Sequence, residues 1–221
     1  AQMKPNYNIA ATKALEVLIE IQIAETPIDS FSILLKQPKV RIVSFTKYAT
    51  LAGVQRHDLV PMFGTNQDAC TFNLGMDIDD VRYVVVYNMR LPYEIIQRGI
   101  ARELGHIALG HDGQTRPTDV RMAEAMCFAH HLISPRPVIQ ILREAFPVTM
   151  NVLTDTTGCS DDCVDELREI PGVSVSRQLN RDVRELFSRG INEYIRFHKA
   201  SIKEDRSPVV DFGSYMEGYE E

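Results

Sequence analysis

The sequence predicts an α+β fold that is mainly helical and contains one small sheet. Apolar residues recur at helical spacing near the N-terminus and again after Asn88, whereas short β-branched runs fall between residues 39 and 87. The predicted order is therefore helices, then strands, then helices. This order differs from the strand–helix alternation of a doubly wound fold.

Three segments are predicted to form the sheet. Lys39–Phe45 places apolar side chains on both faces, Ala69–Leu74 follows, and Val81–Tyr87 is the most β-prone segment of the chain. The polar segment Gly75–Asp80 favours a hairpin between the last two strands. The pattern between Thr46 and Val60 is ambiguous, so we assign no element there.

Helices are predicted on both sides of the sheet. Pro92 opens the longest of them, and Gly110 ends it because glycine readily adopts the conformation that closes a helix. The expected helices are Ala10–Ala24, a segment capped by Asp29 or Ser30 and ending at Leu35, Pro92–Leu109, a segment capped by Thr118 or Asp119 and ending at Ile133, Val138–Ala145, Asp161–Glu169, Ser176–Phe187 and Ile191–Lys199.

The chain is expected to divide near residue 150. We expect residues 1–150 to form the main domain and residues 151–221 to form a helical extension. Apolar side chains between Arg181 and Ile195 recur at helical spacing, which suggests that the extension docks against an apolar surface. From Ser207 onward the chain is polar and ends in acidic residues, which predicts a frayed tail.

The composition argues against several classes of function. Lys and Arg number 24 against 30 acidic residues, so the net charge is -6 and broad nucleic-acid binding is disfavoured. No apolar run approaches the roughly 20 residues that cross a bilayer. No signal-peptide pattern is present. We expect a cytoplasmic protein with no membrane contact and no direct nucleic-acid binding.

Four cysteines are too few for a disulfide scaffold in a chain of this length. We expect them to be reduced thiols. Cys159 and Cys163 are four residues apart, a spacing that also suits a metal site or a redox pair. No second pair of Cys or His lies nearby in the sequence, so the metal alternative is the weaker one.

The segment Ala101–His106 is the most informative for chemistry. On a helix, residues 102 and 106 share one face. Zinc peptidases place His at both positions and Glu beside the first, so that two imidazoles bind the metal and the Glu takes a proton from the bound water. Here Glu103 and His106 are present, but Arg102 stands at the first position.

A second motif follows at Glu124–Pro135, where Glu124 could serve as the third zinc ligand. With both motifs in order after Val86-Tyr87-Asn88, the chain resembles the ImmA/IrrE-type metallopeptidases. That family pairs a strand ending in Tyr-Asn with Ala-His-Glu-Leu-Gly-His and then Glu-Ala-x-x-Phe-Ala-x-x-Leu-Leu-x-Pro. The resemblance is dense over Val81–Pro135 and looser before it.

The resemblance implies a zincin-like, minimal gluzincin fold in which two helices hold a zinc ion. It also implies a cytoplasmic peptidase that cleaves helix-turn-helix repressors, often encoded on mobile genetic elements. By position, Glu103 would be the general base, and His106 and Glu124 would be zinc ligands. His111 and His131 are further candidates, either as hydrogen-bond partners behind the ligands or as polar groups on helix surfaces.

Arg102 conflicts with this chemistry, because a guanidinium has no lone pair to offer and repels a dication. His111 would lie about 140° further round the helix than His106 and point away. His131 would lie about 10 Å along the axis from Glu124. Glu103 could bind a metal but would then cease to be a free base. We therefore expect the Arg102 guanidinium to replace the metal, lying between Glu124 and Glu103.

These observations leave three readings of function. The favoured one is a pseudoenzyme with a degenerate metal site, which binds or regulates a partner protein such as a helix-turn-helix repressor. The alternative is an active zinc endopeptidase that cleaves such a repressor through an altered metal site. The third is a remnant of a mobile element with no present role. The residue at position 102 separates the first two.

Overall fold

A computed structural model describes residues 3–59, 68–78, 80–113 and 117–219 of the chain. It is mainly helical with a three-stranded sheet, which confirms the predicted α+β class. The helices are α1 (Tyr7–Ile21), α2 (Ser30–Leu35), α3 (Phe45–Ala52), α4 (Arg56–Leu59), α5 (Tyr93–Ala108), α6 (Thr118–Ile133), α7 (Arg136–Ala145), α8 (Met150–Thr157), α9 (Asp161–Glu169) and α10 (Arg177–Glu204), with short 3₁₀ turns η2 (His111–Gly113) and η3 (Gly213–Met216).

The sheet contains β1 (Val40–Ser44), β2 (Ala69–Ile78) and β3 (Val81–Tyr87) in the order β1-β3-β2. β1 runs parallel to β3, and β2 pairs antiparallel to β3 as the expected hairpin. Of the expected turn, Asp79 lies outside the described residues. Because side chains alternate between faces, neighbouring valines of β3 enter different clusters. Val85 joins the main core, whereas Val86 packs with Phe45 and Ala49 of α3.

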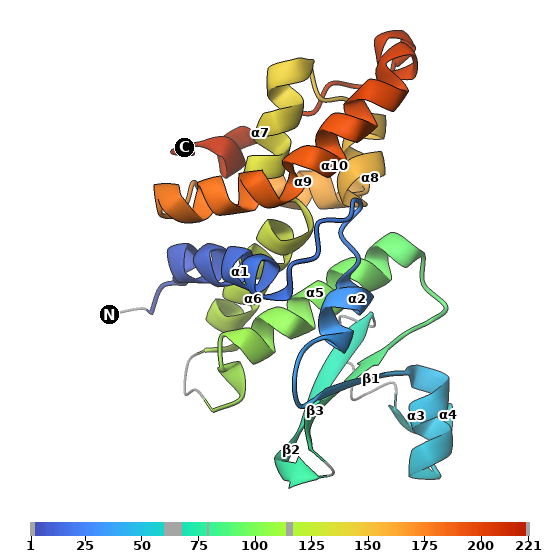
Figure 1. The fold of residues 1–221 in the computed structure, drawn as a ribbon. Helices are drawn as coiled ribbons and strands as arrows, with labels where there is room; N and C mark the ends of the chain where they lie inside the picture. The colour runs from blue at the N-terminus through green and yellow to red at the C-terminus, as the bar shows by residue number, and fades with distance from the viewer. Residues whose placement is uncertain (1–2, 60–67, 79, 114–116, 220–221) are drawn as a thin grey trace.

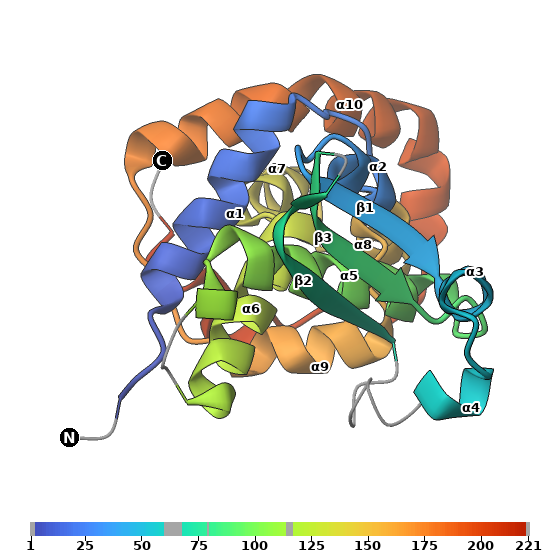
Figure 2. The ribbon, with the colours of Figure 1, turned by 90° about the horizontal axis from the view of Figure 1, so that it is seen from below.

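Four layers of elements follow one another through the molecule. The sheet lies at one end, α5 crosses it, α6 and α1 come next, and α7 to α10 form the opposite end (Figure 1). Seen from the sheet, β2 and β3 lie in front of α5 (Figure 2). This arrangement places α5 and α6, which hold both sequence motifs, at the centre of the fold.

The C-terminal region belongs to the same apolar core as the rest of the chain. Val183, Phe187 and Ile191 of α10 are fully buried in it, so the expected docking is present. The two expected helices in this region are one continuous helix, because the chain does not break at Gly190. A Cβ on Gly190 would lie only 3.3 Å from the Ala24 carbonyl oxygen, so glycine permits close packing here.

Two further expectations about the C-terminal half are wrong. Residues 207–219 are not frayed, because Tyr215 is fully buried and its hydroxyl donates to the carbonyls of His130 and Ser134. Cys159 and Cys163 are not free thiols but a disulfide, since the α8–α9 turn brings their Cα atoms to 5.5 Å. Cys70 and Cys127 are free.

The α3 and α8 helices were not assigned from the sequence. Both begin at a residue whose side-chain oxygen caps the helix, Ser44 and Thr149, and both end at a glycine with positive φ. These capping signals were present in the sequence, but the helices are short and their apolar pattern is weak. None of the described helices combines the length and apolar character needed to cross a membrane.

Candidate functional site

Close packing of α5 on α6 brings the two motifs together. Gly105 lies at the crossing, and a Cβ there would meet Phe128 at 3.0 Å and the Ala125 carbonyl oxygen at 3.1 Å. The absence of a side chain at Gly105 therefore sets the distance between the helices. The buried face of α5 presents Arg102 and Glu103 to the inside of this packing, and α6 presents Glu124.

Arg102 is buried, with 4% of its surface exposed, and its charge is neutralised by two carboxylates. Its Nη1 and Nη2 donate to the two oxygens of Asp68, both at 3.0 Å, in a bidentate pair. Its Nε and Nη2 donate to Glu103 Oε1 at 3.2 and 2.7 Å. Nη2 also donates to the Ala69 carbonyl at 2.9 Å. We name Asp68, Thr71, Arg102 and Glu103 the Arg102 cluster.

Of the two partners expected for Arg102, one is present. The ion pair with Glu103 is present, but the second partner is Asp68 where Glu124 was expected. Asp68 reaches the guanidinium across Gly99, where a Cβ would lie 2.8 Å from the carboxyl carbon of Asp68. Although burial lowers the pKa of Arg102, the charges of Glu103 and Asp68 raise it above its ordinary value. Arg102 therefore stays cationic.

Glu103 is occupied on both of its oxygens. Oε1 accepts from Arg102, and Oε2 accepts from the Thr71 hydroxyl at 2.8 Å. Burial raises the pKa of Glu103, and the charge of Arg102 and the Thr71 hydrogen bond offset only part of this effect. A general base needs a free lone pair directed at the proton it takes. In this arrangement Oε1 accepts two hydrogen bonds from Arg102, and Oε2, which accepts one from Thr71, keeps a single further lone pair.

The other predicted ligands form a chain of hydrogen bonds, which we name the histidine chain. His106 Nδ1 lies 2.9 Å from His111 Nδ1, and His111 Nε2 lies 3.1 Å from Glu124 Oε2. The second oxygen of Glu124 accepts from the backbone N–H of Asn6 at 2.7 Å, just before α1. The chain therefore ties α5, α6 and the start of α1 to one another.

The expectation that His111 points away is wrong. It assumed that the helix continues, but α5 ends at Ala108 and Gly110 adopts a positive φ of 63°. The chain reverses there, and η2 carries the His111 ring back between His106 and Glu124, where it is 2% exposed. Gly110 was recognised as a helix end, and its effect on the direction of the next side chain was missed.

The hydrogen-bond partners assign one proton of the histidine chain. With Glu124 as a carboxylate acceptor, His111 Nε2 donates to it. Between His106 and His111, one Nδ1 donates and the other accepts. Burial, reinforced by the charges near it, lowers the pKa of His106 to about 4. The ring is neutral at pH 7 and a weak base.

A small cleft opens beside this chain. It has a volume of about 190 Å³ and is lined by residues of β2, β3, α5, η2 and α6: Thr71, Asn73, Tyr83, Glu103, His106, Ile107, His111, Asp112 and Arg121. Asn73 and the Tyr83 hydroxyl both donate to Asp112, which fixes η2 against the sheet. The volume is below the 300–1,000 Å³ typical of small-molecule sites.

His131 lies away from this cleft, although it was expected behind the metal ligands. It is fully buried, its Nδ1 lies 2.9 Å from the Cys127 carbonyl oxygen, and its ring packs on Tyr215. It packs at the junction of α6 with the C-terminal tail.

Asp68 and Thr71 are the site residues that sequence reasoning missed. They precede and enter β2, some 30 residues before their partners, and no spacing rule links them to Arg102. One signal was available: a buried guanidinium requires a carboxylate, and Asp68 stands directly before a predicted strand. The sequence alone could not choose it over Glu124.

The arrangement does not fit a zinc ion. Structural and catalytic zinc sites need at least three converging donors. Here a cation occupies one ligand position, Glu103 binds that cation, and His111 and Glu124 bind each other. Across residues 3–59, 68–78, 80–113 and 117–219, no three His, Cys, Asp or Glu side chains are placed to hold a metal.

Comparison with known proteins does not identify a family for this chain. Models of protein families, curated proteins and solved structures were each searched with the chain, and none of them matches it.

Proposed function

We propose that the chain is a protein-binding, non-catalytic relative of the ImmA/IrrE-type metallopeptidases, in which an internal ion pair replaces the metal. The observation that supports this proposal is the buried guanidinium of Arg102, held by Asp68 and Glu103. A guanidinium keeps its charge at all accessible pH values. The positive charge that the family obtains from zinc is supplied here by the chain itself.

Loss of hydrolysis follows from the same contacts. A metallopeptidase needs a carboxylate free to take a proton from water. Glu103 is instead bound by Arg102 and Thr71. The fold needs these contacts, because a buried charge without a partner costs several kcal/mol. The same residues that would perform chemistry in the family therefore stabilise the protein here.

Binding of an extended protein segment is favoured by the sheet next to the cleft. β2 is an outer strand in the order β1-β3-β2, and Thr71 and Asn73 of β2 line the cleft. An outer strand offers backbone donors and acceptors to a further strand, while pockets select the side chains. We propose that the partner adds a strand along β2 and inserts one side chain into the cleft. A helix-turn-helix repressor remains the partner class to test first.

The metal part of the proposal is tested with Arg102→His and its matched control Arg102→Gln. Both variants remove the cation, but only histidine adds a ligand. We expect no stoichiometric zinc by elemental analysis in the unmodified protein or in R102Q, and zinc-dependent thermal stabilisation of R102H alone. Near-stoichiometric zinc in the unmodified protein would overturn the proposal.

One observation supports the alternative of an altered metal site. His106, His111 and Glu124 are neighbours in a single hydrogen-bond chain, so rotation of His111 could free three donors together. In that case the unmodified protein would bind zinc, and His111→Ala would abolish binding. The elemental analysis therefore separates the two candidates.

The binding part is tested with a substitution inside the cleft. Ile107→Arg fills the cleft, and Thr50→Arg places the same charge on the exposed face of α3 as a control. Candidate repressors are immobilised, and their mass is checked after incubation. We expect binding that I107R abolishes and T50R retains, with the repressor intact. Cleavage of the repressor would support the enzyme instead.

A further inference from the structure

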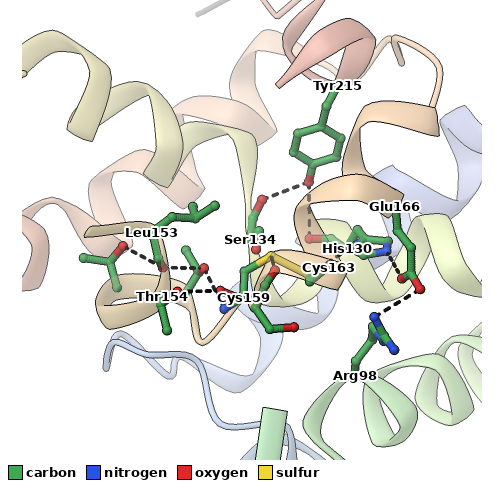
Figure 3. The surroundings of a disulfide bond; sticks show 12 residues. Arg98, His130, Ser134, Leu153, Thr154, Cys159, Cys163, Glu166 and Tyr215 are labelled. Atoms are coloured by element: carbon green, nitrogen blue, oxygen red, sulfur yellow. Dashed lines mark hydrogen bonds and ion pairs between the residues drawn. A yellow bond between two sulfur atoms is a disulfide. The ribbon is translucent and has the colours of Figure 1, made fainter. Parts of the chain in front are cut away.

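A second cluster of reactive groups lies at the junction of α6 and α9, separate from the cleft. The disulfide joins Cys159 in the α8–α9 turn to Cys163 in the first turn of α9, and both residues are at least 98% buried. Figure 3 shows that His130, at the end of α6, and Glu166, one turn further along α9, lie beside this bond. The sequence left a redox pair open for these cysteines.

His130 contacts the disulfide sulfur on one side and a partly exposed carboxylate on the other. Its Nδ1 lies 3.6 Å from Cys163 Sγ, and its Nε2 lies 3.1 Å from Glu166 Oε2. The other oxygen of Glu166 pairs with Arg98 of α5 at 3.0 Å. The His130 side chain is 1% exposed, whereas that of Glu166 is 38% exposed. We name Cys163, His130, Glu166 and Arg98 the sulfur relay.

The protons of the sulfur relay can be assigned from its partners. Burial raises the pKa of Glu166, but the hydrogen bond from His130 and the charge of Arg98 outweigh it, so the pKa is lowered and the carboxylate is ionised. A carboxylate only accepts, so His130 Nε2 bears a hydrogen. Burial lowers the pKa of His130, which keeps the ring neutral and leaves Nδ1 as a bare lone pair.

Among the residues that the structure describes, none donates to this lone pair while the disulfide is intact. A disulfide sulfur has no hydrogen, and the Nδ1 atom that faces it lies on a completely buried residue. Reduction creates a Cys163 S–H at that position, which can donate to Nδ1. A buried acceptor that lacks a donor is destabilising, so the surroundings of the disulfide favour its reduced state.

We propose that Cys159 and Cys163 form a reversible thiol–disulfide exchange site whose substrate class is a dithiol reductant, and that His130 holds the reduced Cys163. One thiolate of the dithiol attacks Cys159 Sγ, the disulfide bond breaks, and its electron pair leaves on Cys163 Sγ. The second thiol of the reductant then displaces Cys159. The reductant ends as a disulfide, and its two protons end on Cys159 and Cys163, where the Cys163 hydrogen points to His130 Nδ1.

The location of the site gives the exchange a route to the rest of the molecule. Cys159 lies in a three-residue turn between α8 and α9, where Gly158 adopts a φ of 72°. Cys159 is fully buried, so this turn has to open before a reductant can reach its sulfur. Glu166 connects the first turns of α9 to Arg98, one turn before Arg102 on α5. The sulfur relay therefore ends on α5, the helix that also lines the cleft.

The test is a redox titration of the full chain with a matched pair of variants. The protein is equilibrated in mixtures of reduced and oxidised dithiothreitol, alkylated, and each cysteine is quantified by peptide mass. We expect Cys159 and Cys163 to pass reversibly from disulfide to thiol, while Cys70 and Cys127 stay thiols throughout. Failure of the pair to reduce in the folded protein, or its presence as thiols at every ratio, would overturn the proposal.

Glu166→Gln tests the part played by His130. The substitution removes the carboxylate that fixes the Nε2 proton, so Nδ1 is no longer held as an acceptor. We expect the reductant ratio at the midpoint to rise about three- to tenfold, the equivalent of one hydrogen bond. Asp165→Asn is the control, because Asp165 neighbours Glu166 on α9 with a 75% exposed side chain. Equal midpoints for the two variants would exclude His130 from the site.

A spectroscopic measurement tests the role of His130 independently if a variant folds poorly. ¹⁵N NMR of the histidine rings distinguishes a bare nitrogen from a protonated or hydrogen-bonded one. In the oxidised protein we expect His130 to have a protonated Nε2 and a bare Nδ1, and reduction should move the Nδ1 signal toward that of a hydrogen-bonded nitrogen. Cys163→Ser should give the same shift without reductant. A protonated Nδ1 in the oxidised state would contradict the proposal.

Discussion

Two histidine–carboxylate pairs, each with one member on α6, have the same nitrogen–oxygen distance and different surroundings. His111–Glu124 and His130–Glu166 each have a nitrogen–oxygen distance of 3.1 Å. The Glu124 side chain is 3% exposed, whereas that of Glu166 is 38% exposed. The first pair is enclosed by groups that already satisfy it, Asn6 and His106. The second runs from solvent to a bond that a reductant can break.

The comparison teaches that burial, and not pair geometry, decides what such a pair can do. In the enclosed pair both groups are buried and already hydrogen-bonded, so they stabilise the fold. In the half-open pair the carboxylate retains contact with water and the far end meets a disulfide. The same contrast applies to the arginines: the side chain of Arg102 is 5% exposed and that of Arg98 is 17% exposed.

The largest expected effect is that of Arg102→Gln. The substitution leaves Asp68 and Glu103 buried without their cation, which costs about 3–5 kcal/mol of unfolding free energy. Arg98→Gln is the matched control on the same helix, and its more exposed pair should cost about 1 kcal/mol or less. Urea unfolding at pH 7 measures both. Equal losses would mean that Arg102 is not the centre of a buried charge cluster.

A direct comparison of the two histidine pairs should give the next largest effect. Glu124→Ala leaves the buried His111 Nε2–H without its acceptor and also removes the acceptor of the Asn6 N–H, at a cost of about 3 kcal/mol. Glu166→Ala should cost about 1 kcal/mol, because water can reach the groups that it leaves. The same urea experiment ranks them. A larger loss for E166A would reverse the assignment of the enclosed and half-open pairs.

The sequence predicted these two regions to different extents for physical reasons. Helical spacing is a local property, so the placement of Glu103 and His106 on one helix could be read directly. His111 could not, because the turn at Gly110 redirects the chain. Asp68 reaches Arg102 across 34 residues, and only the packing of β2 against α5 decides that it does.

The C-terminal half shows the same limit. The recurrence of Val183, Phe187 and Ile191 predicted an apolar face, which is buried as expected. The pattern did not predict that α10 continues through Gly190, where the helix packs closely against the Ala24 carbonyl, 166 residues earlier in the chain. The disulfide likewise could not be predicted from the spacing of its cysteines, because it depends on the α8–α9 turn.

Acid should destabilise the protein through the buried junction of α6. Burial lowers the pKa of His131 to about 3, below its unfolded value of about 6.5. The unfolded chain therefore binds a proton more readily, and stability falls as the pH decreases from about 6.5 toward about 3. His131→Phe should reduce the slope of unfolding free energy against pH by up to about one proton in this window. An unchanged slope would show that His131 titrates normally in the folded protein.

The smallest effect tests whether the enclosed pair depends on the helix that begins beside it. Asn6 caps α1 through its side chain, which accepts from the Ile9 N–H at 3.1 Å, while its backbone N–H donates to Glu124. Asn6→Ala removes only the side-chain cap and should cost about 1 kcal/mol. Asn6→Gly, which caps nearly as well, should cost a few tenths of a kcal/mol. If the backbone N–H of residue 6 still donates to Glu124 in N6A, the unfolding free energy lost in the double variant should equal the sum of the losses in N6A and E124A. A combined loss well below the sum would mean that the cap and the carboxylate act as one unit, and that the start of α1 is part of the site.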